Sequence, residues 1–432
     1  MSSKQDGSRA IWSWALYDFA NSPFTTLVVT FVYATYFTQA IAPDPITGTV
    51  LWSRAVALTA VVVAVCSPIL GALADRGGYQ KLFVLLATLI CALATMALYP
   101  VLPGQVWTAL ALLFVANVAF EFGMVFYNAF LPGLVPRERI GRISGYGWGL
   151  GYLGGLLALG IALVTLIQPD MPWFGFSKDT GANIRATNLL VGVWFLVFSV
   201  PFFLWVGEPS PRRTEERQGV GAAFAKLSRT LKEIRQHRQV VRFLLARMIY
   251  NDGLVTIFAF GGIYAAGTFG FSLPEVLIFG IMINLAAGIG ALTLGHVDDL
   301  IGGKLTLVIS LVGLFAATLL AVVAPTKAWL WVAGIVIGIF VGPNQSASRS
   351  LMARFAPPDA QSEFFGFFAF SGKLTAFLGP LSLGLLTQWS GSQRVGISVV
   401  LVLFGVGLVL LSTVDEQEGM RASGRHSTDR HR

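Results

Sequence analysis

The sequence is poor in charged residues and in the side chains that bind metals. Only 12% of its 432 residues are charged and 55% are hydrophobic, whereas a soluble protein of this length would carry about 25% charged residues. This deficit excludes a set of soluble domains, and the same composition excludes a disordered chain, a collagen and a coiled coil. Four histidines and two cysteines provide neither a disulfide framework nor ligands for zinc or haem, so no cofactor is expected. The composition predicts a polytopic membrane protein.

Long apolar runs make up most of the chain. A helix needs about 20 mostly apolar residues to cross a bilayer, and these runs are too long and too apolar to be barrel strands. The sequence therefore predicts an all-α integral membrane protein with twelve transmembrane helices. The twelve runs are Trp12–Thr38, Ser53–Ala74, Leu82–Tyr99, Val106–Phe130, Ile143–Ile167, Ala186–Val206, Val241–Ala266, Leu273–Gly295, Leu305–Val323, Ala328–Ser350, Phe364–Trp389 and Val395–Val414.

Basic residues are unevenly distributed between the segments that join these runs. With both termini inside, the inner segments carry 22 of the 30 Lys and Arg residues and the outer loops carry five, which is the positive-inside pattern. This predicts two cytoplasmic termini, in a bacterial cytoplasmic (inner) membrane. The net charge of +8 is then explained by orientation and by contact with anionic lipid of the inner face, and no nucleic-acid binding is expected.

A basic segment divides the chain into two halves. Within residues 207–240, apolar residues recur at helical spacing between Phe224 and Ile234, opposite basic ones. This pattern fits either a helix lying on the inner leaflet or a solvated linker. The predicted organisation is an N-terminal six-helix half (1–206), the linker (207–240), a C-terminal six-helix half (241–414) and a disordered cytoplasmic tail (415–432).

The two halves repeat each other. After the second run stand Gly71, Asp75 and Gly78, and after the eighth run stand Gly295, Asp299 and Gly302, each 224 residues later. Glycines 155 and 160 of the fifth run match glycines 379 and 384 of the eleventh at the same offset. Two six-helix halves in parallel repeat, joined by a loop, describe the major facilitator architecture.

The repeated loop resembles the signature of that superfamily between its second and third helices. Arg76 and Lys81 complete the first copy, and Lys304 completes the second. We expect Asp75 to cap a helix end and to pair with cationic groups across the two halves, forming a gating latch that breaks as the halves rock. A tight turn with a solvated charge is the alternative. Tyr79-Gln80 stands where the superfamily often has a basic residue, so the first latch is expected to be weaker.

Further motifs recur along both halves of the chain. They are Tyr17-Asp18-Phe19-Ala20-Asn21-Ser22, Phe126-Tyr127-Asn128-Ala129-Phe130-Leu131-Pro132, Gln345-Ser346-Ala347-Ser348-Arg349-Ser350, Phe364-Phe365-Gly366-Phe367, Ser371-Gly372-Lys373 and Gly379-Pro380. These motifs resemble those of one branch of the superfamily, the UMF1 or Atg22-like (vacuole effluxer-like) family, and the resemblance covers nearly the whole chain. It implies a vacuole-effluxer-like permease, with amino-acid export attributed to fungal members, and it implies a monomer.

Ionisable residues lie within the apolar runs, where each costs about 2.5–3.5 kcal/mol to insert. These residues could neutralise one another as structural pairs. However, polar neighbours share their helical faces, as Asp18 does with Asn21, and such stripes line water or substrate more readily than they pack against lipid. The acids are Asp18, Glu121 and Asp252, and the bases are Arg247, Arg349 and Lys373.

We therefore expect a central site for a small zwitterionic or anionic solute. Lys373 or Arg349 would hold a carboxylate, and Asp18 or Asp252 would face an amino group. Glu121 has few polar neighbours and is the first candidate for a proton carrier, because a desolvated carboxyl group retains a proton more readily. Asp18 and Asp252 are the other proton-coupling candidates, and sodium coupling is the alternative. The other expected substrate contacts are Tyr17, Asn21, Tyr127, Asn128, Asn251 and Gln345.

The expected function is secondary active transport by alternating access. The leading cargo is a small, amino-acid-like solute moved by a proton gradient as symport or antiport, with efflux favoured by the family resemblance. A permease for a sugar, drug or lipid-like cargo and a non-transporting scaffold or receptor remain alternatives. Catalysis is not expected, because no Ser/His/Asp or Cys/His set can be placed in one cavity. ATP-driven transport has no support either: Gly372-Lys373 resembles the end of a phosphate-binding loop, but the upstream Gly366 is one residue too far away and Leu374 stands in place of Ser or Thr.

Overall fold

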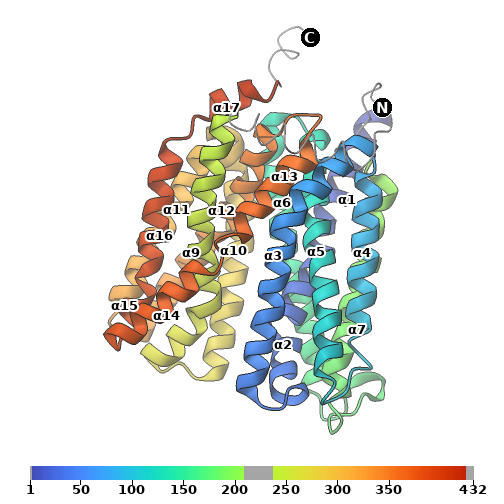
Figure 1. Cartoon of the computed structure of the whole chain (residues 1–432), viewed down its shortest axis with the longest axis vertical. Coiled ribbons are helices and arrows are strands. Elements are labelled where there is room, and N and C mark those ends of the chain that lie inside the picture. Colours follow the sequence, from blue (N-terminus) through green and yellow to red (C-terminus); the bar gives the residue numbers. More distant parts are fainter. Residues whose placement is uncertain (1, 209–236, 425–432) are drawn as a thin grey trace. The chain divides into compact units, whose positions relative to one another are not determined.

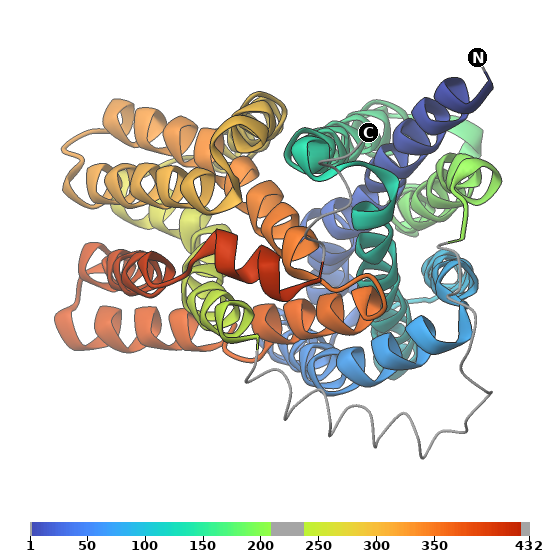
Figure 2. The ribbon, with the colours of Figure 1, turned by 90° about the horizontal axis from the view of Figure 1, so that it is seen from above.

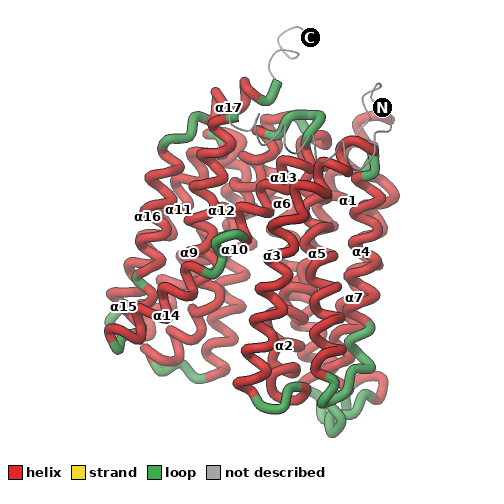
Figure 3. Tube along the Cα trace, in the orientation of Figure 1, coloured by secondary structure: helices red, strands yellow, loops and turns green. Residues whose placement is uncertain are grey.

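The computed structural model describes residues 2–208 and 237–424. Within these residues every regular element is a helix (Figure 3). Eleven helical segments are long and apolar enough to cross a membrane, and a twelfth apolar helix, α4 (Gln80–Met96), is shorter. Each of these twelve segments overlaps one of the twelve predicted runs, with ends that differ by several residues, and the all-α membrane fold is confirmed. The amphipathic stretch between Phe224 and Ile234 lies outside the described residues.

The chain forms two compact units that interleave along the sequence. Unit 1 comprises Met1–Val65, Gly78–Tyr127 and Leu150–Pro211, and unit 2 comprises Cys66–Gly77, Asn128–Gly149 and Arg212–Arg432. This division differs from the predicted one, because two segments of the N-terminal half, 66–77 and 128–149, belong to the unit that holds the C-terminal helices. Helices α3 (Pro45–Gly77), α5 (Val106–Leu134) and α6 (Ile140–Ala162) therefore contribute to both units.

Unit 1 is built around the first helix, α1 (Ser2–Pro23). A tryptophan of α7, Trp194, donates its indole N–H to the Phe19 carbonyl at 3.1 Å. A Cβ added to Gly154 of α6 would collide with the same carbonyl, so α6 and α7 both pack directly on α1. The remaining elements of this part of the chain are η1 (Phe24–Phe31), α2 (Tyr33–Tyr36), η2 (Phe37–Ile41), η4 (Leu163–Ile167), η5 (Trp173–Gly175) and α7 (Ala182–Trp205).

Unit 2 contains the helices of the C-terminal half together with η3 (Arg137–Arg139). Small residues let α10 and α12 approach closely, because a Cβ on Gly338 or Gly342 of α12 would meet backbone oxygens of α10. The C-terminal helices, labelled in Figure 1, are α9 (Arg238–Phe269), α10 (Leu273–Ile301), α11 (Gly303–Val323), α12 (Lys327–Phe355), α13 (Gln361–Lys373), α14 (Leu378–Ser390), α15 (Gln393–Ile397), α16 (Val399–Ser412) and α17 (Glu416–Ala422).

The eleventh span is broken, although the sequence predicted one continuous helix over Phe364–Trp389. Helix α13 ends at Lys373 and α14 begins at Leu378, and the two orange segments meet at this break in Figures 1 and 2. The cause is local. Pro380 has no N–H to donate to the preceding turn, and Gly379 before it has no side chain to stiffen the backbone.

The segment after the last span is ordered over part of its length. Residues 416–422 form helix α17, whose N-terminus is capped by the Asp415 side chain, which accepts from the Glu418 amide at 2.9 Å. The sequence suggested disorder for the whole tail, and the structure differs for these residues. Residues 425–432 lie outside the described part of the chain.

Candidate functional site

Three aromatic side chains stack between α1 and α5 in unit 1. The rings of Trp14 and Tyr17 each lie 4.7 Å from the ring of Tyr127. The Trp14 indole donates to the Tyr127 carbonyl, the Tyr127 hydroxyl donates back to the Trp14 carbonyl, and the Tyr17 hydroxyl bonds Thr88 at 2.7 Å. All three aromatic side chains are buried. The predicted substrate contacts Tyr17 and Tyr127 are thus brought together, and in this structure they form a packed junction of helices.

The predicted acids of the first half also lie in unit 1. Asp18 is buried on α1, and its Cβ would be 3.5 Å from a Cβ added to Gly151 of α6. One turn along α1, the Asn21 amide contacts the Met124 sulfur of α5 at 3.4 Å. Glu121 is half-buried on α5, one turn before Met124. The face of α1 that carries Asp18 and Asn21 therefore lies against α6 at Asp18 and against α5 at Asn21.

Arg349 of α12 binds the segment 128–149 within unit 2. Its Nε and one terminal nitrogen donate to the side chain and carbonyl of Ser144 at 2.9 and 2.7 Å, and its other terminal nitrogen donates to Asn128 Oδ1 at 3.2 Å. The residue is 2% exposed. The structure thus joins two predicted site residues, Asn128 and Arg349. Gln345 lies one turn earlier and is half-buried. A carboxylate clamp at Arg349 would require these hydrogen bonds to break.

Helix α9 contacts the broken span of unit 2 through two successive turns, one with Arg247 and the next with Asn251 and Asp252. Arg247 donates to the Phe368 carbonyl at 2.7 Å, and its guanidinium lies 3.6 Å from the Phe368 ring centre. Asn251 donates to the Gly372 carbonyl at 3.1 Å, next to the half-buried Lys373. Asp252 accepts from the Gly379 amide at 2.9 Å. The predicted residues Asn251, Asp252 and Lys373 therefore lie around one feature, the break between α13 and α14.

Asp75, the acid of the first repeated loop, caps α13. The amides of Ser362 and Glu363 donate to its two carboxylate oxygens, each at 2.9 Å. An acid at a helix N-terminus is stabilised by the free N–H groups and by the helix dipole. Gly78, which follows Asp75, has a φ of 63°, a left-handed conformation that favours glycine. The side chain of Arg76, a predicted latch residue, lies outside the described side chains.

Asp299, the acid of the second loop, caps α6 in the same way. The Gly141 amide donates to Oδ1 at 2.8 Å, and Arg142 forms an ion pair with Oδ2. The neighbouring Asp298 pairs with the buried Arg354 of α12, whose other terminal nitrogen lies 3.8 Å from Asp299. Gly302 follows with a φ of 91°. Each repeated loop therefore ties its helix end to a helix of the opposite sequence half.

Glycines make both ties possible. A Cβ on Gly71 would collide with the Ser362 carbonyl, and one on Gly366 would meet the Ser67 carbonyl. In the second copy, a Cβ on Gly145 would collide with the Ala291 carbonyl, and one on Gly295 would lie 3.0 Å from the Gly141 carbonyl. Backbone therefore packs on backbone in both copies, α3 on α13 and α10 on α6.

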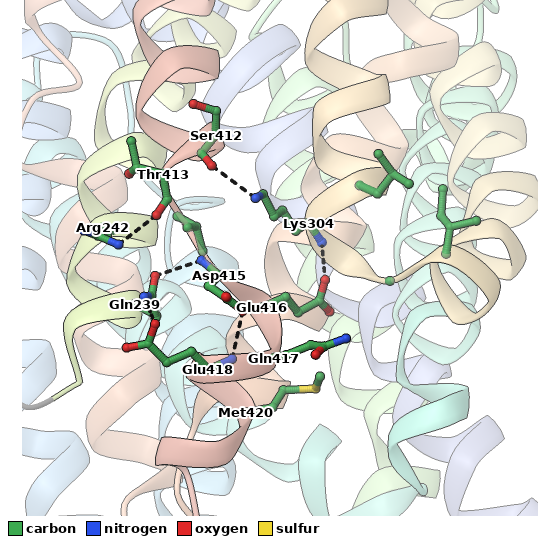
Figure 4. A pocket seen from close by; sticks show the side chains of 14 residues that line it. Gln239, Arg242, Lys304, Ser412, Thr413, Asp415, Glu416, Gln417, Glu418 and Met420 are labelled. Carbon is green, nitrogen blue, oxygen red and sulfur yellow. Dashed lines mark hydrogen bonds between the residues drawn. The ribbon is translucent and has the colours of Figure 1, made fainter.

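The two repeated lysines make equivalent contacts, each within its own half. Lys81 donates its ammonium to the Val206 carbonyl at 2.6 Å, and its amide donates to the Glu208 side chain at 3.1 Å. Lys304 donates its ammonium to the Ser412 carbonyl at 3.2 Å, and its amide donates to Glu416 at 2.9 Å. Figure 4 shows the second set in the wall of a pocket of about 770 Å³ next to α17.

Several residues of these ties were missed from the sequence. Arg354 lies 3.4 Å from Glu416 as well as pairing with Asp298, and Ser144 holds Arg349. The adjacent acids Asp298 and Asp299 could have indicated these partners, because two neighbouring carboxylates need more than one basic side chain to balance their charge. Arg142 and Arg354 had been counted only as inner positive charge, and nothing local distinguishes Ser144 from other serines.

Comparison with known families gives one match that covers most of the chain. The family described as "Vacuole effluxer Atg22 like" matches residues 45–424. The uncharacterized MFS-type transporter YxiO of Bacillus subtilis is 28% identical over 412 residues, 94% of each chain. Autophagy-related protein 22 of Cryptococcus neoformans is 27% identical over 300 residues, which cover 65% of this chain and 54% of the fungal protein. The match to the fungal protein thus spans about half of that protein.

Solved structures of major facilitator transporters share the fold. The proton:xylose symporter XylE superposes with a TM-score of 0.73 at 12% identity, over 96% of this chain and 97% of XylE. The E. coli fucose:proton symporter FucP superposes with a TM-score of 0.71 at 13% identity, over 95% and 98% of the two chains. At these identities the likeness shows the architecture, twelve helices in two repeated halves, and carries no information about cargo.

Proposed function

Because the chain belongs to the vacuole effluxer Atg22-like family, we propose that this membrane transporter of the major facilitator type moves a small, amino-acid-like solute by alternating access. The observation that carries the proposal is the pair of repeated ties at Asp75 and Asp299. The two ties join helix ends from the two sequence halves through hydrogen bonds and, at Asp299, through an ion pair with the partly exposed Arg142. Such contacts can break and re-form without unfolding a helix.

The substrate class is proposed from the charged groups within the spans. Lys373, half-buried at the end of α13, is the candidate that would hold a carboxylate. Asp18 on α1 is the candidate that would face an amino group. Glu121, Asp18 and Asp252 are the three proposed candidates for proton coupling. The proposal also includes outward transport and a monomeric state. Both termini would lie in the cytoplasm of a bacterial cell, where the inner face of the protein would contact anionic lipid.

The test uses the purified protein in proteoliposomes loaded with a pH-sensitive dye. Pools of amino acids and small peptides are added to one side, and liposomes with Lys373→Ala serve as the matched control. The proposal expects proton movement that needs both a particular pool and Lys373. If the wild-type protein moves no solute from any pool, under a pH gradient or a sodium gradient, the amino-acid-like cargo is wrong. If Lys373→Ala transports with unchanged apparent affinity, the carboxylate role of Lys373 is wrong.

A further inference from the structure

We infer that Asp252 and the break between α13 and α14 form the binding site for the coupling cation, a proton or a sodium ion. The role of the site in coupling rests on the proposed transport function, but the binding itself does not. Three features of the described part of unit 2 support the inference. A helix is interrupted inside a span, a buried carboxylate there has one oxygen without a hydrogen-bond partner, and no second acid of the described residues lies at this place.

The break removes helical hydrogen bonds. The Ala376 amide reaches only the Lys373 carbonyl, at 3.4 Å, and the Leu378 amide turns to the Thr375 carbonyl at 2.8 Å. Pro380 has no N–H, so the turn before it loses one donor altogether. Backbone groups released inside a span must find other partners, because no water is available in the hydrocarbon region.

Helix α9 provides hydrogen-bond partners for some of the backbone groups that the break releases. Asn251 donates to the Gly372 carbonyl on the α13 side, and Asp252 Oδ2 accepts from the Gly379 amide on the α14 side. In the opposite direction, Thr375 within the break donates its hydroxyl to the Met248 carbonyl at 3.0 Å. The ends of both half-helices are thus held by one stretch of α9, and the carboxylate of Asp252 holds the N-terminus of α14.

The second oxygen of the same carboxylate is unsatisfied. Asp252 is 1% exposed, and its Oδ1 has no hydrogen-bond partner among the described residues. A buried carboxylate oxygen without a donor is costly, and a bound cation would remove that cost. The nearby Thr256 hydroxyl donates to the Asp252 carbonyl at 2.8 Å and keeps its lone pairs available. Oxygen donors of this kind suit a proton or a hard cation, and interrupted helices are where transporters bind such ions.

The charged groups around Asp252 leave its carboxylate as the acid of this site. On α9 itself, Arg247 is directed to Phe368 and Ser371, and on α13 the nearest charged residue is Lys373. Helices α14 and α16 have no ionisable side chain. The charged groups of α10, α12 and α15 are bound elsewhere: Glu275 with Lys327, Asp298 with Arg354, Asp299 with Arg142, Arg349 with Ser144, and Arg394 with the Val322 carbonyl.

Occupancy of this site would act directly on the break. The charged carboxylate is a strong acceptor for the Gly379 amide. A proton or sodium ion at Oδ1 withdraws that charge and weakens the tie to α14, so that the half-helix is free to shift relative to α9. Binding of the cation and movement of the eleventh span are thereby linked through one hydrogen bond.

The first test needs no substrate. Thermal unfolding of the purified wild-type protein is measured in NaCl against choline chloride and, separately, between pH 5 and pH 8. A ligand that binds the folded protein raises its melting temperature. We expect one of the two conditions to shift the wild type and Asp252→Asn to lose that shift, because asparagine keeps an acceptor for Gly379 but carries no charge. Asp359→Asn, at an exposed acid outside the proposed site, is the matched control and should keep it.

Two further results decide the source of the cation and guard against misfolding. Thr256→Ala keeps the carboxylate but removes an oxygen donor, so it should weaken a sodium shift at least threefold and leave a proton shift unchanged. Three outcomes would each overturn the inference. Asp252→Asn could fold and show the same shift as the wild type, Glu121→Gln could lose the shift instead, or the wild type could show no shift in either condition. A wild type that binds the cation at Asp252 but transports no pool would overturn the proposed function and leave the site standing.

Discussion

The tie at Asp299 should control how often the segment 128–149 separates from the C-terminal helices. The carboxylate is 2% exposed and makes two close contacts, one with the Gly141 amide and one with Arg142. Loss of a helix cap costs about 1 kcal/mol. The Arg142 side chain is 37% exposed, so its ion pair contributes at most about 1 kcal/mol. Asp299→Ala should therefore favour the separated state by about 2 kcal/mol, or roughly thirtyfold. Asp299→Asn keeps the cap acceptor and should change the equilibrium only about fivefold, from the loss of about 1 kcal/mol.

The separation can be measured by modification of a single buried thiol. Ser362 is fully buried beside Asp75, and its hydroxyl has no hydrogen-bond partner among the described residues. Ser362→Cys in a Cys66→Ser background is thus a mild change, and the new thiol should react with a water-soluble maleimide only when the tie opens. The reaction rate in lipid nanodiscs should rise in the order wild type, Asp299→Asn, Asp299→Ala.

The native Cys91, buried on α4, is the internal control. If its modification rate rises together with that of the reporter, the variant has unfolded generally and the reporter rate does not measure opening of the tie. If Cys91 stays protected and the reporter rate in Asp299→Ala equals that of the wild type, the two ties do not open together. The reasoning from the repeated loops would then be refuted.

Three further predictions concern other contacts. Gly379→Ala places a methyl group against Thr256 and should destabilise the protein by about 1–3 kcal/mol, whereas Gly384→Ala, which meets no atom within 4 Å, should change the thermal midpoint little; equal midpoints would contradict the close approach of α14 to α9. Glu416→Ala removes the cap of α11 and the contact with Arg354, so it should lower the free energy of unfolding in denaturant by about 1–2 kcal/mol. Gln417→Ala, at the exposed neighbouring residue, is the control and should leave that free energy unchanged. Tyr127→Phe leaves the Trp14 carbonyl without its hydroxyl donor and should lower the free energy of unfolding by about 1 kcal/mol. Solute affinity should not change, because the ring is buried among protein side chains. A large loss of affinity at unchanged stability would instead make Tyr127 a substrate contact.

The number and order of the spans could be predicted because transfer of apolar side chains into a bilayer depends on local composition. The repeated loops could be found because a tight turn, a helix cap and a close helix crossing each require a particular residue type, glycine or aspartate. The positive φ of Gly78 and Gly302, and the caps by Asp75 and Asp299, are the physical reasons that these letters recur.

The partners of the buried charges could not be predicted in the same way. Arg349 lies among polar residues of α12 and was interpreted as a carboxylate clamp, but its hydrogen bonds go to Asn128 and Ser144, more than 200 positions away in the chain. Such pairings depend on the register of helices distant in sequence. The break in the eleventh span was visible as Gly379-Pro380, yet apolar composition alone is continuous across it, so the hydropathy pattern predicted one helix.

The two repeats share one helix crossing, in which a glycine of one helix meets a threonine of another. In unit 1, a Cβ on Gly155 of α6 would lie 2.6 Å from the hydroxyl of Thr26, which donates to the Ser22 carbonyl. In unit 2, a Cβ on Gly379 would collide with the hydroxyl of Thr256, which donates to the Asp252 carbonyl.

The helix crossing is therefore built from the same glycine and threonine in both units, and α6 runs unbroken from Ile140 to Ala162 through its copy. Only the second copy has a proline after the glycine, and only there does an acid stand where the first copy has a serine. Since the crossing forms equally well without them, the break and the buried carboxylate are not needed to hold the helices together. The broken helix and the buried carboxylate are both costly, and they occur together at the same crossing of one copy. Selection for ion binding explains this combination, whereas selection for packing does not.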